Sequence, residues 1–491
     1  AFGEENLYPA TASWTTRTGL LAPMYDWPIA LKGMDLAPGV VEKWELAADG
    51  LSWIYNVRKG IKFHDGSSLT ARDLKFTFDS ALAPKSVATY LKGMVDRVEV
   101  AGDFIVRVFT KGPQPYLPNM TTLYDPSEGA VVPKDYFERS GASGFAERPV
   151  GSGPFAFARR VPGDSIQFEA NLGYWGQVPA FKKLTINLMP EEGTRVAALK
   201  TGELDAIEVG FDAARALETA GYTTPALDFV IPTIHLFGAY DSRGASLPLA
   251  DVRVRQALSL AINRDEIRKT FFYGKADPAF VSPLPEGTAD LDTAFWRDYS
   301  DKLYRYDTAE AKRLLTAAGY PNGFTLKLYT FAMTGAPYLP KLGEITAGYW
   351  EKVGVKAQVT PVDYGVFRTM YMKSPPDPAL VGSALVWRLT DNPIAPKPMT
   401  STYAPVAGKL QLLSNAMPDL AALIDGAMTE PNTAKRRDML AKAVKTGAET
   451  FVGLPISTAP MMSALGPNVK IPFPKPAISL SYYLGIATHG K

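Results

Sequence analysis

Histidine and cysteine are the side chains that most often hold metals or act as nucleophiles, and this sequence is poor in both. The three histidines, His64, His235 and His489, stand alone, without the spacing of a metal site. There is no cysteine, which excludes thiol catalysis, disulfide bonds and cysteine-based metal centres. Neither the His-Glu-Xaa-Xaa-His pattern nor Gly-Xaa-Ser-Xaa-Gly occurs. We therefore predict no catalytic residues, no metal and no cofactor, and interpret His64 as a structural histidine.

Two other motifs have a chemical interpretation that the sequence does not favour. Acidic pairs at Glu191-Glu192 and Glu203/Asp205 are compatible with glycoside hydrolysis, but such pairs more often solvate turns. The Gly151-Ser152-Gly153 run could be taken for a phosphate loop. No Lys-Ser/Thr follows it, and Pro154 lacks the N-H that a phosphate cradle would use. Neither motif predicts a nucleotide or a hydrolytic site.

The segment from Glu42 to Phe78 carries the clearest structural signals. Turn signals at Asp49-Gly50 and Lys59-Gly60 separate runs of alternating polarity, which predicts three short antiparallel strands. Thr70 stands three residues before Asp73, at the start of an amphipathic pattern, and this predicts a helix that opens with a capping box.

The same segment resembles the signature of the family 5 extracellular solute-binding proteins, the oligopeptide-, dipeptide- and nickel-binding subunits of ABC importers. The similar runs are Glu42-Lys43-Trp44-Glu45, Asp49-Gly50, Arg58-Lys59-Gly60-Ile61-Lys62-Phe63-His64-Asp65-Gly66 and Thr70-Ala71-Arg72-Asp73-Leu74. Further similar elements follow along nearly the whole chain, at residues 150–155, 195–205, 248–262 and 306–312. The resemblance implies an α/β, bilobal periplasmic-binding-protein fold of the large three-part variety.

Local patterns and this resemblance together predict the domains. Domain I is formed by residues 1–35, 151–237 and 469–491, a mainly antiparallel small domain by 36–150, and the second α/β lobe by 238–468. In domain I, a helix capped by Thr194 and a strand at 206–209 predict parallel pairing.

Arg253 and Arg255 look catalytic only out of context. Asp251 is predicted to cap the helix that carries them, and residues two apart on a helix point to different faces. We therefore predict exposed or structural ion-pair roles for both arginines.

The stretch from Ala384 to Pro393 is the main candidate for ligand contact. It resembles a cleft segment of the family in which peptide-binding members hold the ligand's α-ammonium with an aspartate, and this implies that Asp391 is such an anchor. Asp391 lies four residues after Trp387 instead of the family's three, which can redirect its side chain. Arg388 is a candidate for a ligand carboxylate because its planar fork binds bidentately, with a surface arginine as the alternative.

Aromatic residues make up 11% of the chain and can form the walls of a cleft. Tyr25-Asp26-Trp27-Pro28 is similar to a family element near the ligand. The aromatic candidates, which can stack on sugars or on apolar peptide side chains, are Tyr25, Trp27, Tyr240, Trp387 and Tyr403. The alternative for each is an ordinary place in a hydrophobic core.

Composition narrows the partners and the compartment. With 52 basic and 50 acidic residues the formal charge is +2, which gives no reason to expect nucleic acid or an anionic membrane surface as a partner. No apolar run approaches the roughly 18 to 20 residues of a membrane span. We interpret the chain as a mature exported monomer without its signal peptide, periplasmic, or lipid-anchored outside a Gram-positive cell.

The sequence therefore predicts a substrate-binding protein of an ABC importer that closes by hinge motion over a small ligand and delivers it to a permease. A short peptide is the first choice. An oligosaccharide, an opine-like compound or a metal chelate are alternatives, the last weakened by the scarcity of histidine. An exported hydrolase and a ligand-dependent sensor or chaperone are alternatives of other classes.

Overall fold

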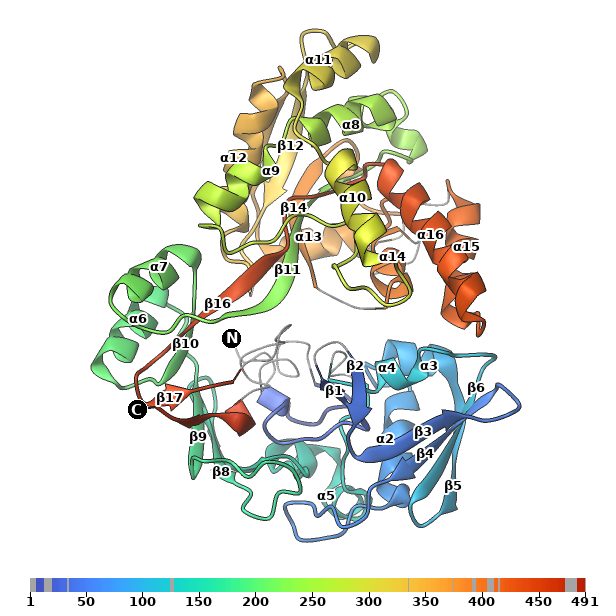
Figure 1. Ribbon diagram of the computed structural model, residues 1–491, viewed down its shortest axis with the longest axis vertical. Coiled ribbons are helices and arrows are strands. Elements are labelled where there is room, and N and C mark those ends of the chain that lie inside the picture. Colours follow the sequence, from blue (N-terminus) through green and yellow to red (C-terminus); the bar gives the residue numbers. More distant parts are fainter. Residues whose placement is uncertain are drawn as a thin grey trace. The chain divides into compact units, whose positions relative to one another are not determined.

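The computed structural model describes most of the chain, namely residues 6–12, 20–32, 35–123, 128–333, 335–373, 375–390, 394–403, 410–413, 416–472 and 484–490. The chain divides into two compact units, unit 1 (Ala1–Leu227 with Met462–Lys491) and unit 2 (Asp228–Met461). It passes from one unit to the other within strands β11 (Ala226–Leu236) and β16 (Ala459–Leu465) (Figure 1). The predicted three-part domain division stays a prediction.

The first part of unit 1 is a four-stranded antiparallel sheet with a helix on one face. The strand order is β3-β4-β6-β5, with bounds Val41–Leu46, Ser52–Val57, Ile105–Thr110 and Val95–Gly102. Helix α2 (Ala71–Leu82) begins with the predicted capping box between Thr70 and Asp73 and packs Phe78 against Tyr55 of the sheet. The third strand predicted after Lys59-Gly60 does not form, because the chain there makes only an isolated bridge between Lys62 and Ser68.

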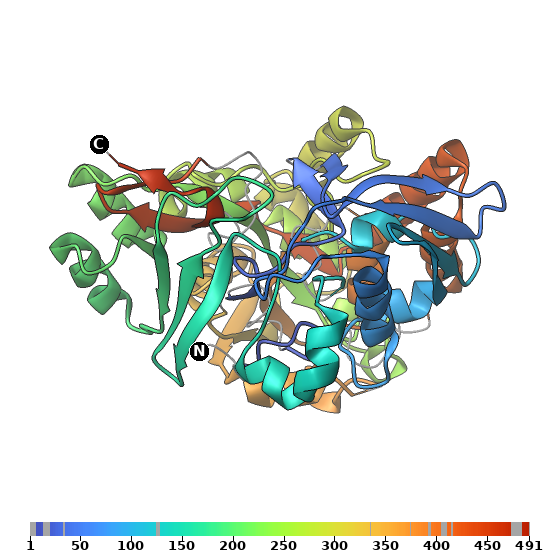
Figure 2. The same cartoon turned by 90° about the horizontal axis from the view of Figure 1, so that it is seen from below.

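Unit 1 also contains a three-stranded antiparallel sheet, which lies at the lower left of Figure 2 in teal and green. Its strands are β7 (Phe155–Val161), β8 (Ser165–Ala170) and β9 (Lys183–Asn187). A two-stranded hairpin, β1 (Ile29–Lys32) with β2 (Asp35–Pro38), follows the Tyr25–Pro28 segment. The remaining helices and strands of unit 1 are α3 (Thr89–Met94), α4 (Leu117–Met120), α5 (Lys134–Glu147), α6 (Glu192–Thr201), α7 (Phe211–Thr219), β17 (Val469–Lys470) and β18 (Thr488–His489).

The parallel pairing predicted for domain I is wrong. Strand β10 (Ala206–Val209) does follow helix α6, but its partner is β16, which returns from the far end of the sequence and runs antiparallel to it. Local pattern could not show this, because the partner lies more than 250 residues away in the sequence. Helix α6 also begins before Thr194, with Glu191 as its N-cap.

Unit 2 is built on a mixed sheet in which β11, β14, β12 and β13 are neighbours in that order. Strand β12 (Thr325–Thr330) runs parallel to both β13 (Lys356–Pro361) and β14 (Ala384–Thr390), while β11 runs antiparallel to β14. The short strand β15 (Gly453–Pro455) also pairs with β11. Helices α12 (Leu339–Glu351) and α13 (Tyr364–Tyr371) connect the parallel strands, as in other α/β folds.

Several other helices of unit 2 begin at a side-chain cap, among them the cap predicted at Asp251. Asp251, Asp307 and Asn432 each accept a hydrogen bond from a backbone N-H of the first turn. Their bounds are α8 (Val252–Leu260), α11 (Thr308–Ala317) and α16 (Thr433–Glu449), with α9 (Arg264–Glu266), α10 (Thr293–Leu303), α14 (Pro396–Tyr403) and α15 (Pro418–Thr429) completing the set.

Of the two arginines of α8, Arg253 has the exposed ion-pair role that the sequence predicted, whereas Arg255 is a buried structural residue that is held by uncharged acceptors. Arg253 is exposed and pairs with Asp251 at 2.6 Å. Arg255 is 1% exposed and donates to the carbonyl oxygens of Thr450 and Leu249. Although they stand only two positions apart on one helix, Arg253 therefore forms an exposed ion pair and Arg255 is a buried hydrogen-bond donor.

Candidate ligand-binding site

The carboxylate of Asp26 joins three segments of unit 1. Its Oδ2 accepts hydrogen bonds from Ser152 Oγ at 2.8 Å and Trp175 Nε1 at 2.9 Å, and its Oδ1 accepts one from the Tyr174 hydroxyl at 2.8 Å. The residue is only 9% exposed. These bonds hold the backbone at Asp26 in place. Its neighbours in the sequence, Tyr25 and Trp27, are the candidate aromatic residues of unit 1.

Burial raises the pKa of Asp26 to about 6 from 3.8, against the opposing effect of its three donors. The folded state therefore binds this proton more tightly than the unfolded state, and the stability contribution of Asp26 is lost as pH rises from about 4 to about 6. The difference amounts to about 3 kcal/mol.

We expect Asp26→Asn to remove this pH dependence. The amide oxygen can accept from Ser152 and Trp175, and the amide nitrogen can donate to the Tyr174 oxygen. Urea unfolding of both proteins between pH 4 and 6.5 should show the variant gaining about 3 kcal/mol relative to the parent as pH rises. The control is Asp301→Asn, an exposed carboxylate on α10. Parallel curves for the parent and Asp26→Asn would contradict the prediction.

The Gly151-Ser152-Gly153 run packs against the backbone just before Asp26. The Gly153 N-H donates to the Met24 carbonyl at 2.9 Å, and His64 bridges the run by accepting from the Gly151 N-H at Nδ1 and contacting the Gly153 carbonyl at Nε2. Nε2 therefore carries the proton. Burial lowers the pKa of His64, which favours this neutral form, and the prediction of a structural histidine is confirmed.

Tyr25 and Trp27 differ in what their polar atoms do. Tyr25 is 2% exposed and its hydroxyl donates a hydrogen bond to the Leu7 carbonyl at 3.1 Å, so its side chain is part of the core of unit 1. Trp27 is 6% exposed, and its indole N-H has no acceptor among the residues that the structure describes. Of the two candidates, Trp27 is the one that keeps a donor for a ligand; ligand contact by either stays a prediction.

Trp387, on the interior strand β14 of the unit 2 sheet, lies in an aromatic cluster. Its ring centroid is 5.7 Å from Phe331, 5.8 Å from Tyr371 and 6.3 Å from Tyr364, mostly in tilted or edge-on geometry. Phe331 and Tyr371 are buried, whereas Tyr364 is 38% exposed and Trp387 is half-buried. The buried rings of Phe331 and Tyr371 therefore hold the partly exposed rings of Tyr364 and Trp387 in place.

The position of this aromatic cluster in the sheet favours a binding role. Phe331 directly follows the end of β12, Trp387 is the central residue of β14, and α13 carries the two tyrosines. In open α/β sheets, ligands bind beyond the carboxyl ends of the strands. Phe331 at the end of β12 and helix α13 after the end of β13 thus place the cluster toward the carboxyl ends of the parallel strands, where a ligand is expected.

Arg388 does not lie beside the stacking face of Trp387. Successive residues of a strand point to opposite faces, and Val386, on the same face as Arg388, lies against Gly343 of α12. Arg388 is close to Tyr338, where its charge opposes the rise that burial causes in the pKa of that phenol. Trp387 faces α13 and Arg388 faces α12, and ligand contact by Arg388 stays a prediction.

Tyr240 and Tyr403 are less favourable for ligand contact, because their hydroxyl groups are already engaged within unit 2. The Tyr240 hydroxyl accepts from Arg255 Nη2 at 3.0 Å, and the guanidinium lies 4.9 Å from the centre of its ring. Tyr403 is 3% exposed and donates to the Ser282 carbonyl at 3.2 Å. Asp391 lies outside the described residues. Ligand contact by these three stays a prediction.

Sequence reasoning missed Phe331, Tyr364 and Tyr371. The available signal was the pattern after Asp363, which caps α13 by accepting from the Val366 N-H. Tyr364, Phe367 and Tyr371 then recur at helical spacing, which predicts one aromatic face. Nothing in the pattern could show that this face meets Trp387.

Two further observations concern the part of the chain that the structure describes. No group of three or more His, Cys, Asp or Glu side chains within it could hold a metal ion. None of its helices combines the length and apolar character needed to cross a bilayer.

Comparison with known proteins places the chain in a family. Residues 35–399 match the sequence profile of the bacterial extracellular solute-binding proteins, family 5, middle part. The chain belongs to this family. Membership confirms the predicted family and with it a solute-binding rather than an enzymatic class of protein. The family is described as extracellular, in agreement with an exported protein.

Curated relatives of this family 5 protein match over part of their length. It is 32% identical over 340 residues to the glutathione-binding protein GsiB of Pectobacterium atrosepticum, which covers 68% of this chain and 62% of that protein. It is 28% identical over 386 residues to the dipeptide-binding protein of Escherichia coli, covering 72% and 69%. The matched region thus spans less than two thirds of the length of GsiB.

Among solved structures, the periplasmic binding protein MoaA of A. tumefaciens R10, in complex with mannopinic acid, superposes with a TM-score of 0.76 at 24% identity. The match covers 100% of this chain and 98% of that one. At this identity the likeness shows the fold alone, and it confirms the predicted α/β class of periplasmic binding proteins.

Proposed function

We propose that this protein captures a short peptide outside the cell and delivers it to the permease of an ABC importer. The aromatic cluster of Phe331, Tyr364, Tyr371 and Trp387 carries the proposal. It offers a rigid, partly exposed stacking surface toward the carboxyl ends of the parallel strands, where ligands bind in open α/β sheets. GsiB and the dipeptide-binding protein are both named for small peptides, which supports this ligand class.

In this proposal the aromatic cluster takes an apolar or aromatic side chain of the peptide. Tyr364 and Trp387 supply the accessible faces, and Phe331 and Tyr371 hold them. Asp391, next in the chain after β14, is the proposed anchor for the peptide's α-ammonium. The indole N-H of Trp27, buried without an acceptor among the described residues, is a proposed donor to the ligand.

The proposed mechanism is hinge closure. A ligand that contacts both units favours the closed state because those contacts exist together only there. The permease would then recognise the closed form. Monomeric action in the periplasm or at the cell surface remains part of the proposal.

Calorimetric titration tests the proposal. We expect di- to tetrapeptides with an aromatic residue to bind, and Trp387→Ala to weaken binding about 30-fold, as for the loss of a stacking hot spot. Phe295→Ala is the matched control, because Phe295 is an exposed aromatic residue on α10. Asp391→Lys should also weaken binding of amine-bearing peptides, and unchanged affinity would remove it from the site.

The same titration distinguishes the ligand classes. Tight binding of an opine or an oligosaccharide with no response to peptides would replace the peptide while leaving the aromatic site in place. Peptide binding that is equally strong in the parent and in Trp387→Ala would overturn the site. Thermal unfolding of each variant shows whether a loss of binding reflects a loss of structure.

A further inference from the structure

Unit 2 contains a pocket at the other end of the strands that carry the aromatic cluster. It has a volume of about 390 Å³ and is lined by the beginning of β12, the segment just before β14 and the loop that precedes α8. This volume lies within the range of small-molecule sites in proteins. All of its lining residues belong to unit 2.

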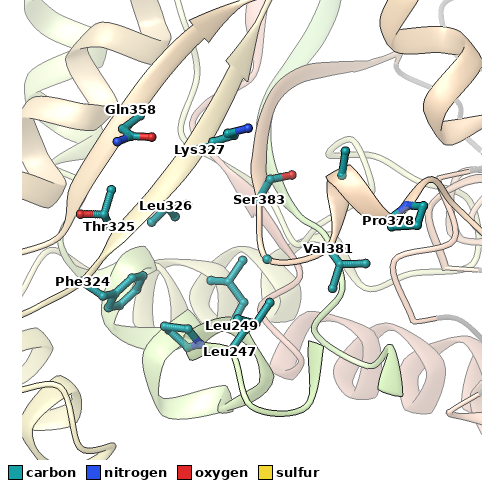
Figure 3. Close-up of a pocket in the computed structure, with 13 residues that line it drawn as sticks. Leu247, Leu249, Phe324, Thr325, Leu326, Lys327, Gln358, Pro378, Val381 and Ser383 are labelled. Atoms are coloured by element: carbon teal, nitrogen blue, oxygen red, sulfur yellow. The ribbon is translucent and has the colours of Figure 1, made fainter. Parts of the chain in front are cut away.

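The pocket has an apolar side and a cationic side. Figure 3 shows Leu247, Leu249 and Phe324 gathered on one side, with Lys327 on the opposite side near Ser383. Leu249 is 1% exposed and forms fixed wall, whereas Leu247 is 37% exposed at the opening. Ser383 uses its hydroxyl on the Leu380 carbonyl, and Lys327 is the charged residue of the lining, which also includes the Gln358 amide and the Thr325 hydroxyl.

The loops that form the pocket are closely packed. Gly382 has φ +80°, and a Cβ built there would lie 2.6 Å from Leu247 Cδ1. A Cβ on Gly238 would lie 2.7 Å from Val381 Cγ1. Such close approaches require glycine, and they hold Leu247 and Val381 in place as walls.

Lys327 lacks a counter-ion in the structure as described. Its ammonium makes no ion pair with any residue of the described ranges, in contrast to Lys341 of α12, which pairs with Glu344. A ligand that fills this pocket must match both an unpaired cation and an apolar wall. That combination is a small amphiphile with an anionic head.

We infer that this pocket is a second binding site, separate from the proposed transport site, for a small amphiphile that carries an anionic head and a short apolar chain. The head pairs with the Lys327 ammonium. The chain lies against Leu247 and Phe324, whose side chains are partly exposed to water, whereas Leu249, at 1% exposed, adds little accessible surface. This inference does not depend on the identity of the transported solute.

The test uses octanoate as the probe in calorimetric titrations of the full-length protein. Octanoate should bind, while octylammonium, with the opposite charge, and acetate, without the chain, should bind at least fivefold more weakly. Lys327→Gln should lower octanoate affinity about fivefold, the modest effect of a partly exposed ion pair. Lys356→Gln, on the adjacent strand β13 and outside the pocket, is the matched control and should have no effect.

Leu247→Trp provides a second variant, because a larger side chain at this partly exposed position should fill the pocket. We expect it to abolish octanoate binding, and thermal unfolding of the variant checks that the fold is kept. No heat from octanoate at millimolar concentration would overturn the proposal, as would equal binding to the parent, Lys327→Gln and Leu247→Trp.

A loss of octanoate binding in Trp387→Ala, with normal binding in Lys327→Gln, would place the probe in the transport site and also overturn the proposal. Peptide binding in the Lys327 and Leu247 variants should equal that of the parent. The failure of this second site and the failure of the proposed transport function are therefore distinguishable.

Discussion

Replacing Arg255 with methionine is expected to lower the free energy of unfolding by about 4 kcal/mol. Its guanidinium donates to the carbonyl oxygens of Thr450, Leu249 and Ala250 and to the Tyr240 hydroxyl, at 2.6 to 3.0 Å. Burial lowers the pKa of Arg255, so the charged form is held by these acceptors against desolvation. Methionine fills similar space but leaves the buried carbonyl groups without donors.

Arg253 supplies the control, because it is the same residue type on the same helix, two positions away. Its side chain is 47% exposed and pairs with Asp251, so Arg253→Met should cost less than about 1 kcal/mol. Urea unfolding followed by circular dichroism measures both. Arg255→Lys should lie between the two, since lysine keeps the charge and loses the fork. Equal stability of the two methionine variants would contradict an anchoring role for Arg255.

Gly153→Ala is expected to destabilise the protein by about 3 kcal/mol. A Cβ at this position would lie 2.5 Å from the carbonyl carbon of Met24 and 2.7 Å from the backbone nitrogen of Tyr25. Both are main-chain atoms, so no change of rotamer relieves the overlap. The segment would have to shift, which would also strain the hydrogen bond between Ser152 and Asp26.

Gly193→Ala is the matched control for this overpacking. Gly193 lies in helix α6, and a Cβ added there would meet no atom within 4 Å, so alanine should be neutral or slightly stabilising. Thermal unfolding of both variants gives the comparison. A melting temperature for Gly153→Ala equal to that of the parent would show that unit 1 does not need this close approach.

Local elements were predictable where a few adjacent residues decide them. The capping box at Thr70 and Asp73, the cap at Asp251 and the strand at 206–209 each follow from residues within one or two turns of chain. The pairing of β10 with β16 did not follow, because it depends on a strand from the other end of the sequence. Hydrophobic periodicity and secondary-structure propensity contain no information about a pairing partner so far away in the sequence.

The candidate site was predictable only in part, for a similar reason. Trp387 could be singled out from its own segment, but its neighbours Phe331 and Tyr364 come from two other segments that only the fold brings together. The alternation of side chains along β14 did bear on Arg388, since adjacent strand residues point to opposite faces. Applied to Trp387 and Arg388, that rule would have separated them from sequence alone.

The burial of Tyr25 and Tyr403 shows the limit of residue type as a guide. Both are tyrosines in segments linked to the cleft by resemblance or composition, yet each uses its hydroxyl on a backbone carbonyl inside a core. Trp27, two residues from Tyr25, keeps an indole N-H without an acceptor in the described ranges. Hydrogen-bond partners, which the sequence does not show, separate these aromatic residues.

The most direct test of the proposed function is native mass spectrometry of the purified protein, followed by denaturation and identification of any small molecule released. We predict a complex heavier than the bare chain and the release of short peptides, which Trp387→Ala should retain at much lower occupancy. Release of a sugar, an opine or a metal chelate in place of peptides, at equal occupancy in the parent and in Trp387→Ala, would contradict both the peptide ligand and the aromatic site.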